Sequence, residues 1–154
     1  MFTLAKQPEN WMKRVKKQQD YALEQFQQAQ PELLNVHRNQ LSEDAYRVCR
    51  LAATEHPFTG KYNDHWLDGV YYCAYCEQPL FDSTVKFNAG CGWPSFWESR
   101  KGQVSYHQDN SLHMQRTEIK CQNCDSHLGH VFDDGPEPTG KRYCVNSVSL
   151  QFKP

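Results

Sequence analysis

The chain has 154 residues, with 17 Lys and Arg against 18 Asp and Glu and a net charge of −1. This length is enough for one domain with a hydrophobic core and too short for two full domains. The balanced charge, without a basic block, predicts no binding to nucleic acid. Because there is no signal-peptide pattern or apolar run of about 18 residues, and the first 35 residues contain Glu9, Asp20 and Glu24, we expect a cytoplasmic protein that does not enter a membrane.

Two helices are predicted in the N-terminal third. In residues 1–35, which are rich in Gln and Lys, apolar side chains recur at helical spacing: Trp11, Val15, Ala22 and Phe26. This pattern is typical of an amphipathic helix with a narrow apolar stripe, and we interpret it as a peripheral extension. The second helix should begin after Ser42, a good N-cap residue, and run to about Ala53, before the turn-forming sequence HPFTG.

From Gly69 onward the pattern changes to short segments rich in Val, Tyr and Phe, separated by Gly, Pro, Asn and Asp. The segments are 69–73, 85–87, 103–107, 113–121, 130–132 and 142–152. They predict an antiparallel β domain. If residues 142–152 form one unbroken strand, alternate side chains share one apolar face: Arg142, Cys144, Asn146, Val148, Leu150 and Phe152.

Four of the seven cysteines form two C-x-x-C pairs, CAYC and CQNC. The four are Cys73, Cys76, Cys121 and Cys124. This arrangement usually binds one tetrahedral zinc ion through four thiolates, which leaves no open position for a catalytic water. Because residues 77–120 exceed the roughly 15 to 20 residues of a simple zinc ribbon, the ion would join two hairpins that are distant in sequence. Two separate redox motifs, or chance, are the alternatives.

The three other cysteines differ in their surroundings. Cys49 lies within the second predicted helix and is interpreted as a small buried apolar residue. Cys91 is flanked by glycines in AGCGWPSFW, which predicts a mobile turn. Cys144 follows Arg142 by two residues, and a guanidinium favours the thiolate over the thiol. An unperturbed cysteine is only about 3% thiolate at pH 7, so a lowered pKa would greatly increase the reactive fraction. Cys144 is therefore predicted to be an activated nucleophile.

Four motifs in order carry a family resemblance: HPFTG, DGVYYCAYC, GCGWPSF and CQNCDSHLGHVFDDGPEPTGKRYCVNS. Over residues 40–153 the chain closely resembles methionine-R-sulfoxide reductase of the B type, also called the selenoprotein-R domain. The resemblance implies a mainly β fold of two antiparallel sheets with short N-terminal helices, and a structural zinc site joining two hairpins. We therefore expect a helical extension over residues 1–35 and a reductase domain over residues 36–154.

The resemblance also implies an activity, which is reduction of the R epimer of methionine sulfoxide, free or in oxidised proteins. Thioredoxin is the implied electron donor. By motif, Cys144 matches the attacking residue, and Cys91 matches the resolving cysteine that forms a disulfide with it. Six further residues match positions around the substrate: Trp93, His127, His130, Asp134, Arg142 and Asn146. We expect the protein to act as a monomer in oxidative repair.

The chemistry of the residues agrees with these roles. The sulfoxide oxygen must be protonated as the thiolate attacks, and an imidazole is the side chain best suited to donate near pH 7, so His127 or His130 can supply the proton. Structural hydrogen bonding and zinc ligation are alternative roles for the histidines. Trp93 can form an apolar wall for the substrate, or it can be an ordinary core residue. Cys49 is an alternative to Cys91 in the resolving step.

Two other functions compete with the reductase. A non-enzymatic zinc-stabilised β domain could bind a small ligand or peptide in an aromatic pocket, and a zinc ribbon could bind DNA. The absence of a basic patch disfavours the DNA-binding protein. A binding module does not need a reactive thiol at Cys144. Failure of selective alkylation at that residue at neutral pH would therefore favour the binding module over the enzyme.

Overall fold

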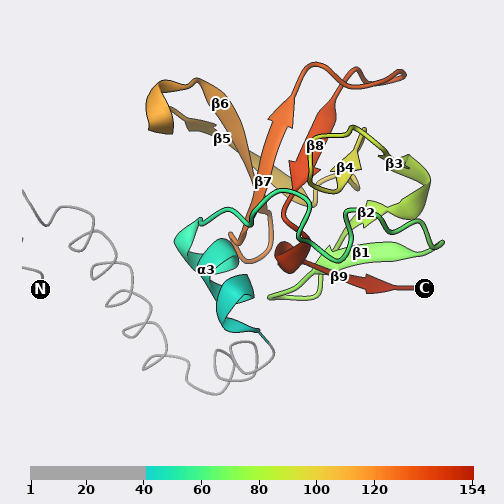
Figure 1. The fold of residues 1–154 in the computed structure, drawn as a ribbon, viewed down its shortest axis with the longest axis horizontal. Coiled ribbons are helices and arrows are strands. Elements are labelled where there is room, and N and C mark those ends of the chain that lie inside the picture. Colours follow the sequence, from blue (N-terminus) through green and yellow to red (C-terminus); the bar gives the residue numbers. More distant parts are fainter. Residues whose placement is uncertain (1–40) are drawn as a thin grey trace, which may run out of the picture. The chain divides into compact units, whose positions relative to one another are not determined.

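A computed structural model of the protein describes residues 41–154 (Figure 1). The helix predicted over residues 1–35 lies outside the described residues. Within them, helix α3 (Glu43–Leu51) precedes two antiparallel β-sheets. The helix begins as predicted, because the Ser42 side chain accepts a hydrogen bond of 3.1 Å from the backbone N–H of Ala45. It ends where Ala52 adopts a left-handed conformation with φ of 57°.

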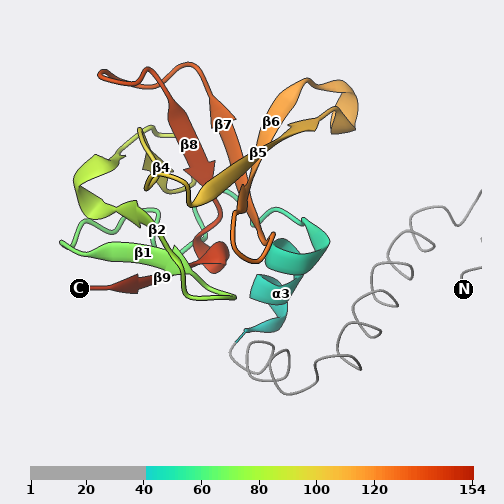
Figure 2. The same cartoon turned by 180° about the vertical axis from the view of Figure 1, so that it is seen from behind.

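The fold is mainly β, as predicted, and its strands form a smaller and a larger sheet (Figures 1 and 2). The three-stranded sheet has the order β2 (Pro79–Asp82), β1 (Val70–Cys73) and β9 (Leu150–Lys153). The six-stranded sheet has the order β3 (Lys86–Phe87), β4 (Ser95–Phe96), β8 (Arg142–Val145), β7 (His127–Phe132), β6 (Arg116–Cys121) and β5 (Val104–Asp109). The sequence analysis did not predict β2 and β4, both of which begin at or directly after a proline.

Aromatic side chains join the two sheets. Phe81 of β2 stacks on Phe96 of β4 with ring centroids 4.4 Å apart, and both side chains are fully buried. Tyr71 of β1 meets the same Phe96 edge to face at 5.2 Å. Burial of large aromatic rings is among the strongest contributions to a core of this size, so this cluster fixes one sheet against the other.

The prediction of one unbroken strand over residues 142–152 is wrong. Strand β8 ends at Val145, a 3-10 turn spans Ser147–Ser149, and β9 belongs to the other sheet. Within β8 the buried side chains are Tyr143 and Val145, whereas Arg142 and Cys144 lie on the less buried face. The turn resets the alternation between the two strands, so Arg142 and Cys144 do not share an apolar face with the residues of β9.

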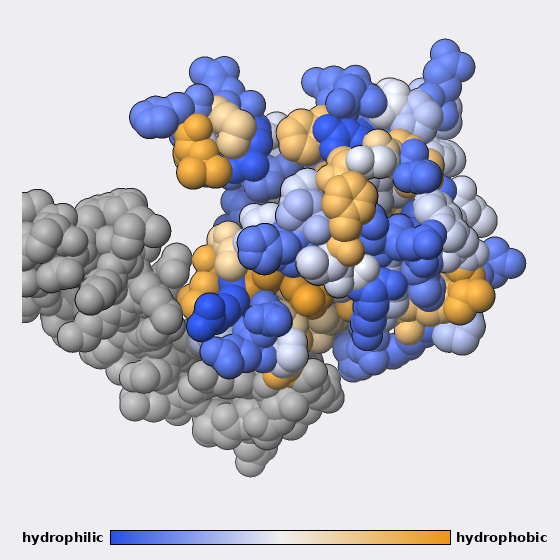
Figure 3. All heavy atoms as spheres, in the orientation of Figure 1, coloured by the Kyte–Doolittle hydropathy of each residue, from blue (hydrophilic) through white to orange (hydrophobic). Residues whose placement is uncertain are grey.

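The outer surface is mixed in character. Figure 3 shows apolar residues scattered among hydrophilic ones on the face that it presents. Large exposed apolar side chains include Phe58, Leu67 and Leu112. No helix of the described region combines the length and the apolar character that crossing a bilayer requires.

Candidate active site and metal centre

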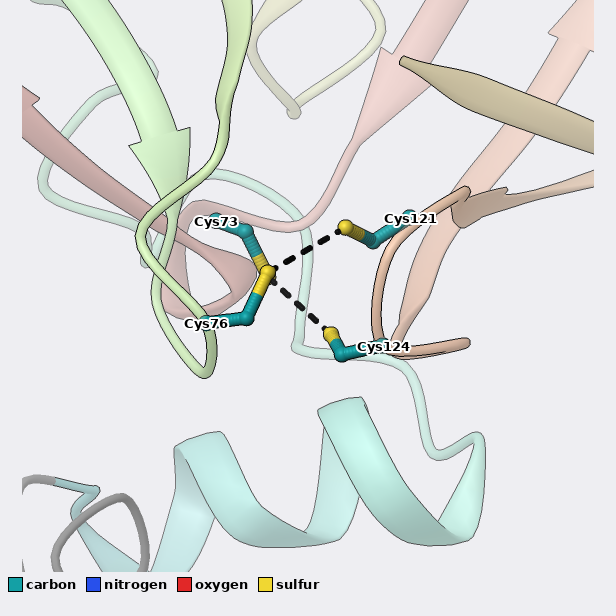
Figure 4. A group of neighbouring side chains, drawn as sticks. All are labelled: Cys73, Cys76, Cys121 and Cys124. Carbon is teal, nitrogen blue, oxygen red and sulfur yellow. Dashed lines mark hydrogen bonds between the residues drawn. The ribbon is translucent and has the colours of Figure 1, made fainter. Parts of the chain in front are cut away.

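Four cysteine side chains converge from two hairpin turns. Cys73 and Cys76 come from the β1–β2 turn, and Cys121 and Cys124 come from the β6–β7 turn (Figure 4). All four sulfur atoms lie within 4.8 Å of one another. The sulfurs of Cys73 and Cys124 are 3.6 Å apart, and those of Cys76 and Cys121 are 3.5 Å apart. A tetrahedral ion with metal–sulfur bonds of about 2.3 Å separates its sulfurs by about 3.8 Å. The four side chains therefore fit one tetrahedral metal ion with little adjustment.

The two turns that present these cysteines have the same backbone geometry. In the first, the N–H of Glu77 donates to the carbonyl of Cys73, and in the second, that of Asp125 donates to Cys121, both at 2.9 Å. Glu77 and Asp125 also have matching left-handed φ angles of 66° and 64°. Each turn thus directs two thiols inward in the same way. The spacing of the C-x-x-C pairs encodes this local geometry.

Helix α3 lies against the group of four cysteines. The Arg50 guanidinium donates to the backbone carbonyl of Cys124 at 2.8 Å and lies 4.5 Å from the ring centroid of Tyr75. Arg50 therefore contacts both cysteine turns. Cys49 is buried on the same helix, as predicted, and burial raises its pKa to about 12. It remains a neutral thiol and does not belong to the group of four.

A second pair of cysteines lies within the six-stranded sheet. The sulfur of Cys91, in the loop before β4, is 3.6 Å from the sulfur of Cys144 on β8. This loop is tied to β8, because the N–H of Val145 donates to the carbonyl of Pro94 at 3.0 Å. The structure thus brings Cys91 to Cys144, whereas Cys49 lies on α3 beside the other cysteines.

The two sulfurs are close enough for one thiol to donate a hydrogen bond to the other. The hydrogen bond from Cys144 lowers the pKa of Cys91 to about 5, with help from Ser95 and the backbone and charge nearby, although burial opposes the shift. The same contact with Cys91, together with burial, raises the pKa of Cys144, and the positive charge of Arg142 only partly offsets this rise. The sequence analysis anticipated the effect of Arg142. It did not anticipate that contact with Cys91 and burial raise the pKa of Cys144 by more than Arg142 lowers it.

Cys144 stands in a row of residues that runs across the large sheet. Its register partners are Ser95 on β4 and His130 on β7, and the next partner beyond His130 is Glu118 on β6. Directly opposed residues of antiparallel strands project from the same face. An imidazole and a carboxylate therefore share the face from which the Cys144 sulfur projects.

A β-bulge brings the second histidine to this face. His127 and His130 are three residues apart and would lie on opposite faces of a regular strand. The register shift between Ile119 and Lys120 places His127 opposite Lys120 and His130 opposite Glu118, so both rings lie on one face. Their centroids are 5.7 Å apart. The two histidines thus form one group, as their proposed role requires.

Each histidine is held by a carboxylate that the sequence analysis missed. His127 Nδ1 lies 2.6 Å from Glu118 Oε2, and His130 Nε2 lies 2.8 Å from Asp109 Oδ2. Burial lowers the pKa of His130, and the Asp109 hydrogen bond opposes this shift. Burial alone would raise the pKa of Glu118, but the hydrogen bond and charge of His127 outweigh it, so the pKa falls. For Glu118 the sequence held a signal, because alternate residues of the predicted segment 113–121 are charged from Arg116 onward, whereas Asp109 lies outside the predicted segments.

Glu55 joins Trp93 to Asn146 at the edge of this site. The Trp93 indole N–H donates to the Glu55 carbonyl at 3.1 Å, and the Glu55 N–H donates to the Asn146 side-chain oxygen at 3.0 Å. Asn146 also donates from its side chain to the carbonyl of Leu128 at 2.9 Å. Both ends of the buried Asn146 amide thus bind backbone groups. Trp93 is only partly buried and can present a ring face to a ligand.

Comparison with known proteins agrees with this geometry. A model of the SelR domain matches residues 41–154, the whole described region. The chain belongs to the SelR domain family. "Peptide methionine sulfoxide reductase MsrB" of Methylibium petroleiphilum is 56% identical over 76% of this chain and 86% of its own length. Proteins of the same name match at 59% identity in Alteromonas mediterranea, covering 74% of this chain and 81% of the relative, and at 56% in Pseudomonas entomophila, covering 79% and 93%.

Among solved structures, the crystal structure of the Mis18 'Yippee-like' domain matches with a TM-score of 0.47 and 18% identity, covering 57% of this chain and 97% of its own.

This SelR domain brings most of the predicted site residues together, and Asp134 is the outermost of them. The Arg142 guanidinium makes two hydrogen bonds to the Asp134 carboxylate, of 2.9 and 3.2 Å, and lies 4.3 Å from the ring centroid of Phe132. The Asp134 side chain is 67% exposed, so it contacts Arg142 from the solvent side. Its position fits a role in orienting the guanidinium beside the sulfurs.

Proposed function

We propose that this chain reduces the R epimer of methionine sulfoxide, free or in oxidised proteins, and that thioredoxin returns the enzyme to its reduced state. The observation that carries the proposal is the pair of cysteine sulfurs 3.6 Å apart, with an imidazole as the cross-strand neighbour of one of them. The names of the relatives give independent support for sulfoxide reduction. The epimer and the reductant follow from the family resemblance.

In the first step the Cys144 sulfur attacks the sulfoxide sulfur. For this attack Cys144 passes its proton to the Cys91 thiolate, whose sulfur is 3.6 Å away. The sulfoxide oxygen takes a proton and is transferred to Cys144, which becomes a sulfenic acid, while methionine leaves. Cys144 is oxidised by two electrons and the substrate sulfur is reduced by two. His130 is the best-placed proton donor, and His127 with Glu118 forms the second half of the same group.

In the second step Cys91 attacks the sulfenic sulfur of Cys144. A disulfide forms, and the sulfenic oxygen leaves as water after taking a proton. A thioredoxin dithiol then attacks the disulfide, is oxidised in turn, and restores both cysteines. Cys91, which took the proton of Cys144 in the first step, gives that proton up again before it attacks, because only the thiolate is a competent nucleophile.

Substrate recognition falls to the residues around the sulfurs. Trp93 offers a flat apolar face for the substrate methyl group and side chain, and the Glu55 carbonyl fixes its indole. Arg142, held by Asp134, contributes positive charge near the two sulfurs. Asn146 shapes the end of β8 through its backbone hydrogen bonds.

We further propose that the four clustered cysteines hold one zinc ion with a structural role. Four thiolates complete a tetrahedral coordination shell, so such an ion leaves no position for substrate or catalytic water. The ion would link a turn of the small sheet to a turn of the large sheet. The reductase domain over residues 36–154, the helical extension over residues 1–35, the monomeric state and the cytoplasmic location stay predictions from the sequence.

The experiment that tests this function is a thioredoxin-coupled assay on separated R and S epimers of N-acetylmethionine sulfoxide. The expected result is turnover of the R epimer only. Cys144→Ser is the control, and it should leave the fold unchanged while removing turnover. Equal use of both epimers would contradict the proposed stereochemistry. Turnover that survives loss of the Cys144 thiol would contradict the mechanism.

A further inference from the structure

A buried serine neighbours both reactive cysteines. Ser95 begins β4, and its side chain is almost fully buried although it is polar. Its hydroxyl oxygen is 3.3 Å from the Cys91 sulfur, and Ser95 is the register partner of Cys144. The Ser95 hydroxyl transfers no proton in the attack on the sulfoxide.

The Ser95 hydroxyl can hydrogen-bond to Cys91 in both of its protonation states. A hydroxyl has one hydrogen to donate and two lone pairs to accept with. The Ser95 hydroxyl donates to the Trp93 carbonyl at 3.1 Å, and a Cys91 thiol can donate to the same carbonyl at 3.5 Å. When Cys91 is a thiolate it can only accept. Rotation of the Ser95 hydroxyl then turns its hydrogen from the Trp93 carbonyl to the sulfur.

The resolving step makes this donor important. In the resting pair, the S–H of Cys144 is the largest contribution to the lowered pKa of Cys91. Once Cys144 has become a sulfenic acid, that S–H no longer exists. Of the other two groups at the Cys91 sulfur, the Trp93 carbonyl cannot donate, whereas the Ser95 hydroxyl can.

We propose that Ser95 is a catalytic residue of the resolving step. This rests on the proposed function, because it assumes that Cys91 resolves a sulfenic acid on Cys144. The Ser95 hydroxyl donates to the Cys91 thiolate and holds its sulfur toward Cys144. Cys91 gives the proton that it took from Cys144 to His130, which lost its own proton in the first step. The thiolate electron pair then forms the S–S bond as the S–O bond of the sulfenic acid breaks, and the oxygen leaves as water with that proton from His130. Ser95 then returns its hydrogen to the Trp93 carbonyl.

The test is a single turnover of Ser95→Ala with the R epimer, in the presence of dimedone, which traps sulfenic acids. Two quantities are measured by mass spectrometry: methionine released per enzyme, and the ratio of Cys144 in the dimedone adduct to Cys144 in the Cys91 disulfide. We expect about one equivalent of methionine, because the nucleophile of that step is Cys144, whereas the Ser95 hydroxyl bonds to Cys91. The ratio should shift toward the adduct by roughly ten- to a hundredfold, the effect of losing one hydrogen bond to a charged group.

The matched control is Ser105→Ala, which removes a serine hydroxyl from β5 of the same sheet, where it contacts His107 at 2.8 Å. Its ratio should equal that of the wild type. If Ser95→Ala does not fold, Ser95→Thr and Ser95→Val form an isosteric pair that differs only in the hydroxyl, and only the valine variant should shift the ratio. An unchanged ratio in a variant without the hydroxyl overturns the role of Ser95. If the wild type itself forms no Cys91–Cys144 disulfide, the proposed function fails instead.

Discussion

Replacing Cys91 by serine separates the two steps of the reaction. In the structure the two sulfurs are 3.6 Å apart, and a disulfide bond is about 2.05 Å long. The sulfurs must therefore approach by only about 1.5 Å, which side-chain rotation can provide without moving a strand. Cys91→Ser removes the only thiol that the described residues place at this distance from Cys144. We expect about one equivalent of methionine per enzyme, followed by arrest with thioredoxin as the reductant.

The first step should survive the substitution for an electrostatic reason. Cys91 is the main cause of the raised pKa of Cys144, so its removal lowers that pKa and leaves the charge of Arg142 less opposed. Without Cys91 the Cys144 proton passes to solvent, and the lower pKa leaves a larger fraction of Cys144 as thiolate. The rate of methionine release at neutral pH should therefore equal or exceed that of the wild type. A small dithiol such as dithiothreitol should restore part of the turnover, because it can attack the sulfenic acid directly.

The assay is rapid-quench measurement of methionine, followed by steady-state turnover with thioredoxin and then with dithiothreitol. Cys49→Ser is the matched control, since it removes a cysteine that lies on α3, away from the sulfur pair. The control should turn over like the wild type. Normal recycling of Cys91→Ser by thioredoxin, together with failure of Cys49→Ser, would refute the reasoning and assign the resolving role to Cys49.

Three further predictions follow from the site. Cys144→Ser should reduce turnover below a few per cent of wild type in the thioredoxin-coupled assay, while zinc content and melting temperature stay unchanged, because serine offers no comparable nucleophile. Cys121→Ser should lose both zinc and most of the folding stability, since a structural zinc site contributes on the order of 10 kcal/mol. Atomic emission measures the zinc and urea unfolding measures the stability, and a variant that keeps its stability without the metal would contradict this. Glu118→Gln should slow methionine release roughly tenfold or more by weakening the orientation of His127, without loss of zinc; an unchanged rate would show that this carboxylate has no part in proton delivery.

The metal centre and the reactive sulfurs are linked through the strands that they share. Cys121 is the last residue of β6, the strand of Glu118, and β7 begins with His127 directly after the second cysteine turn. Ser149 adds a second connection, because its carbonyl accepts from Ala74 in the first turn and its hydroxyl donates to the His127 carbonyl, both at 2.9 Å. A metal ion bound at the turns would therefore fix the ends of the strands that carry the histidines. Under the proposed function, an ion with a closed coordination shell would influence the reaction in this way without touching the substrate.

Several features follow from short stretches of sequence. The start of α3 depends on Ser42 and its neighbours, and the two cysteine turns depend on the C-x-x-C spacing. These signals are local, because capping and tight turns involve groups only a few residues apart. The sequence therefore predicted the helix, the cluster of four cysteines and, through the family resemblance, that Cys91 lies near Cys144. It also predicted the β class from the composition and punctuation of the second half.

Other features were decided by the tertiary structure. The break after Val145 passes the chain from one sheet to the other, and the alternating pattern of residues 142–152 does not reveal it. The bulge that places both histidines on one face is a property of how β7 pairs with β6. Glu118 and Ser95 become part of the site only because strand register aligns them with Cys144 across several strands. Register is set by packing between segments that are distant in the sequence, so no local pattern of residues encodes which side chains finally meet.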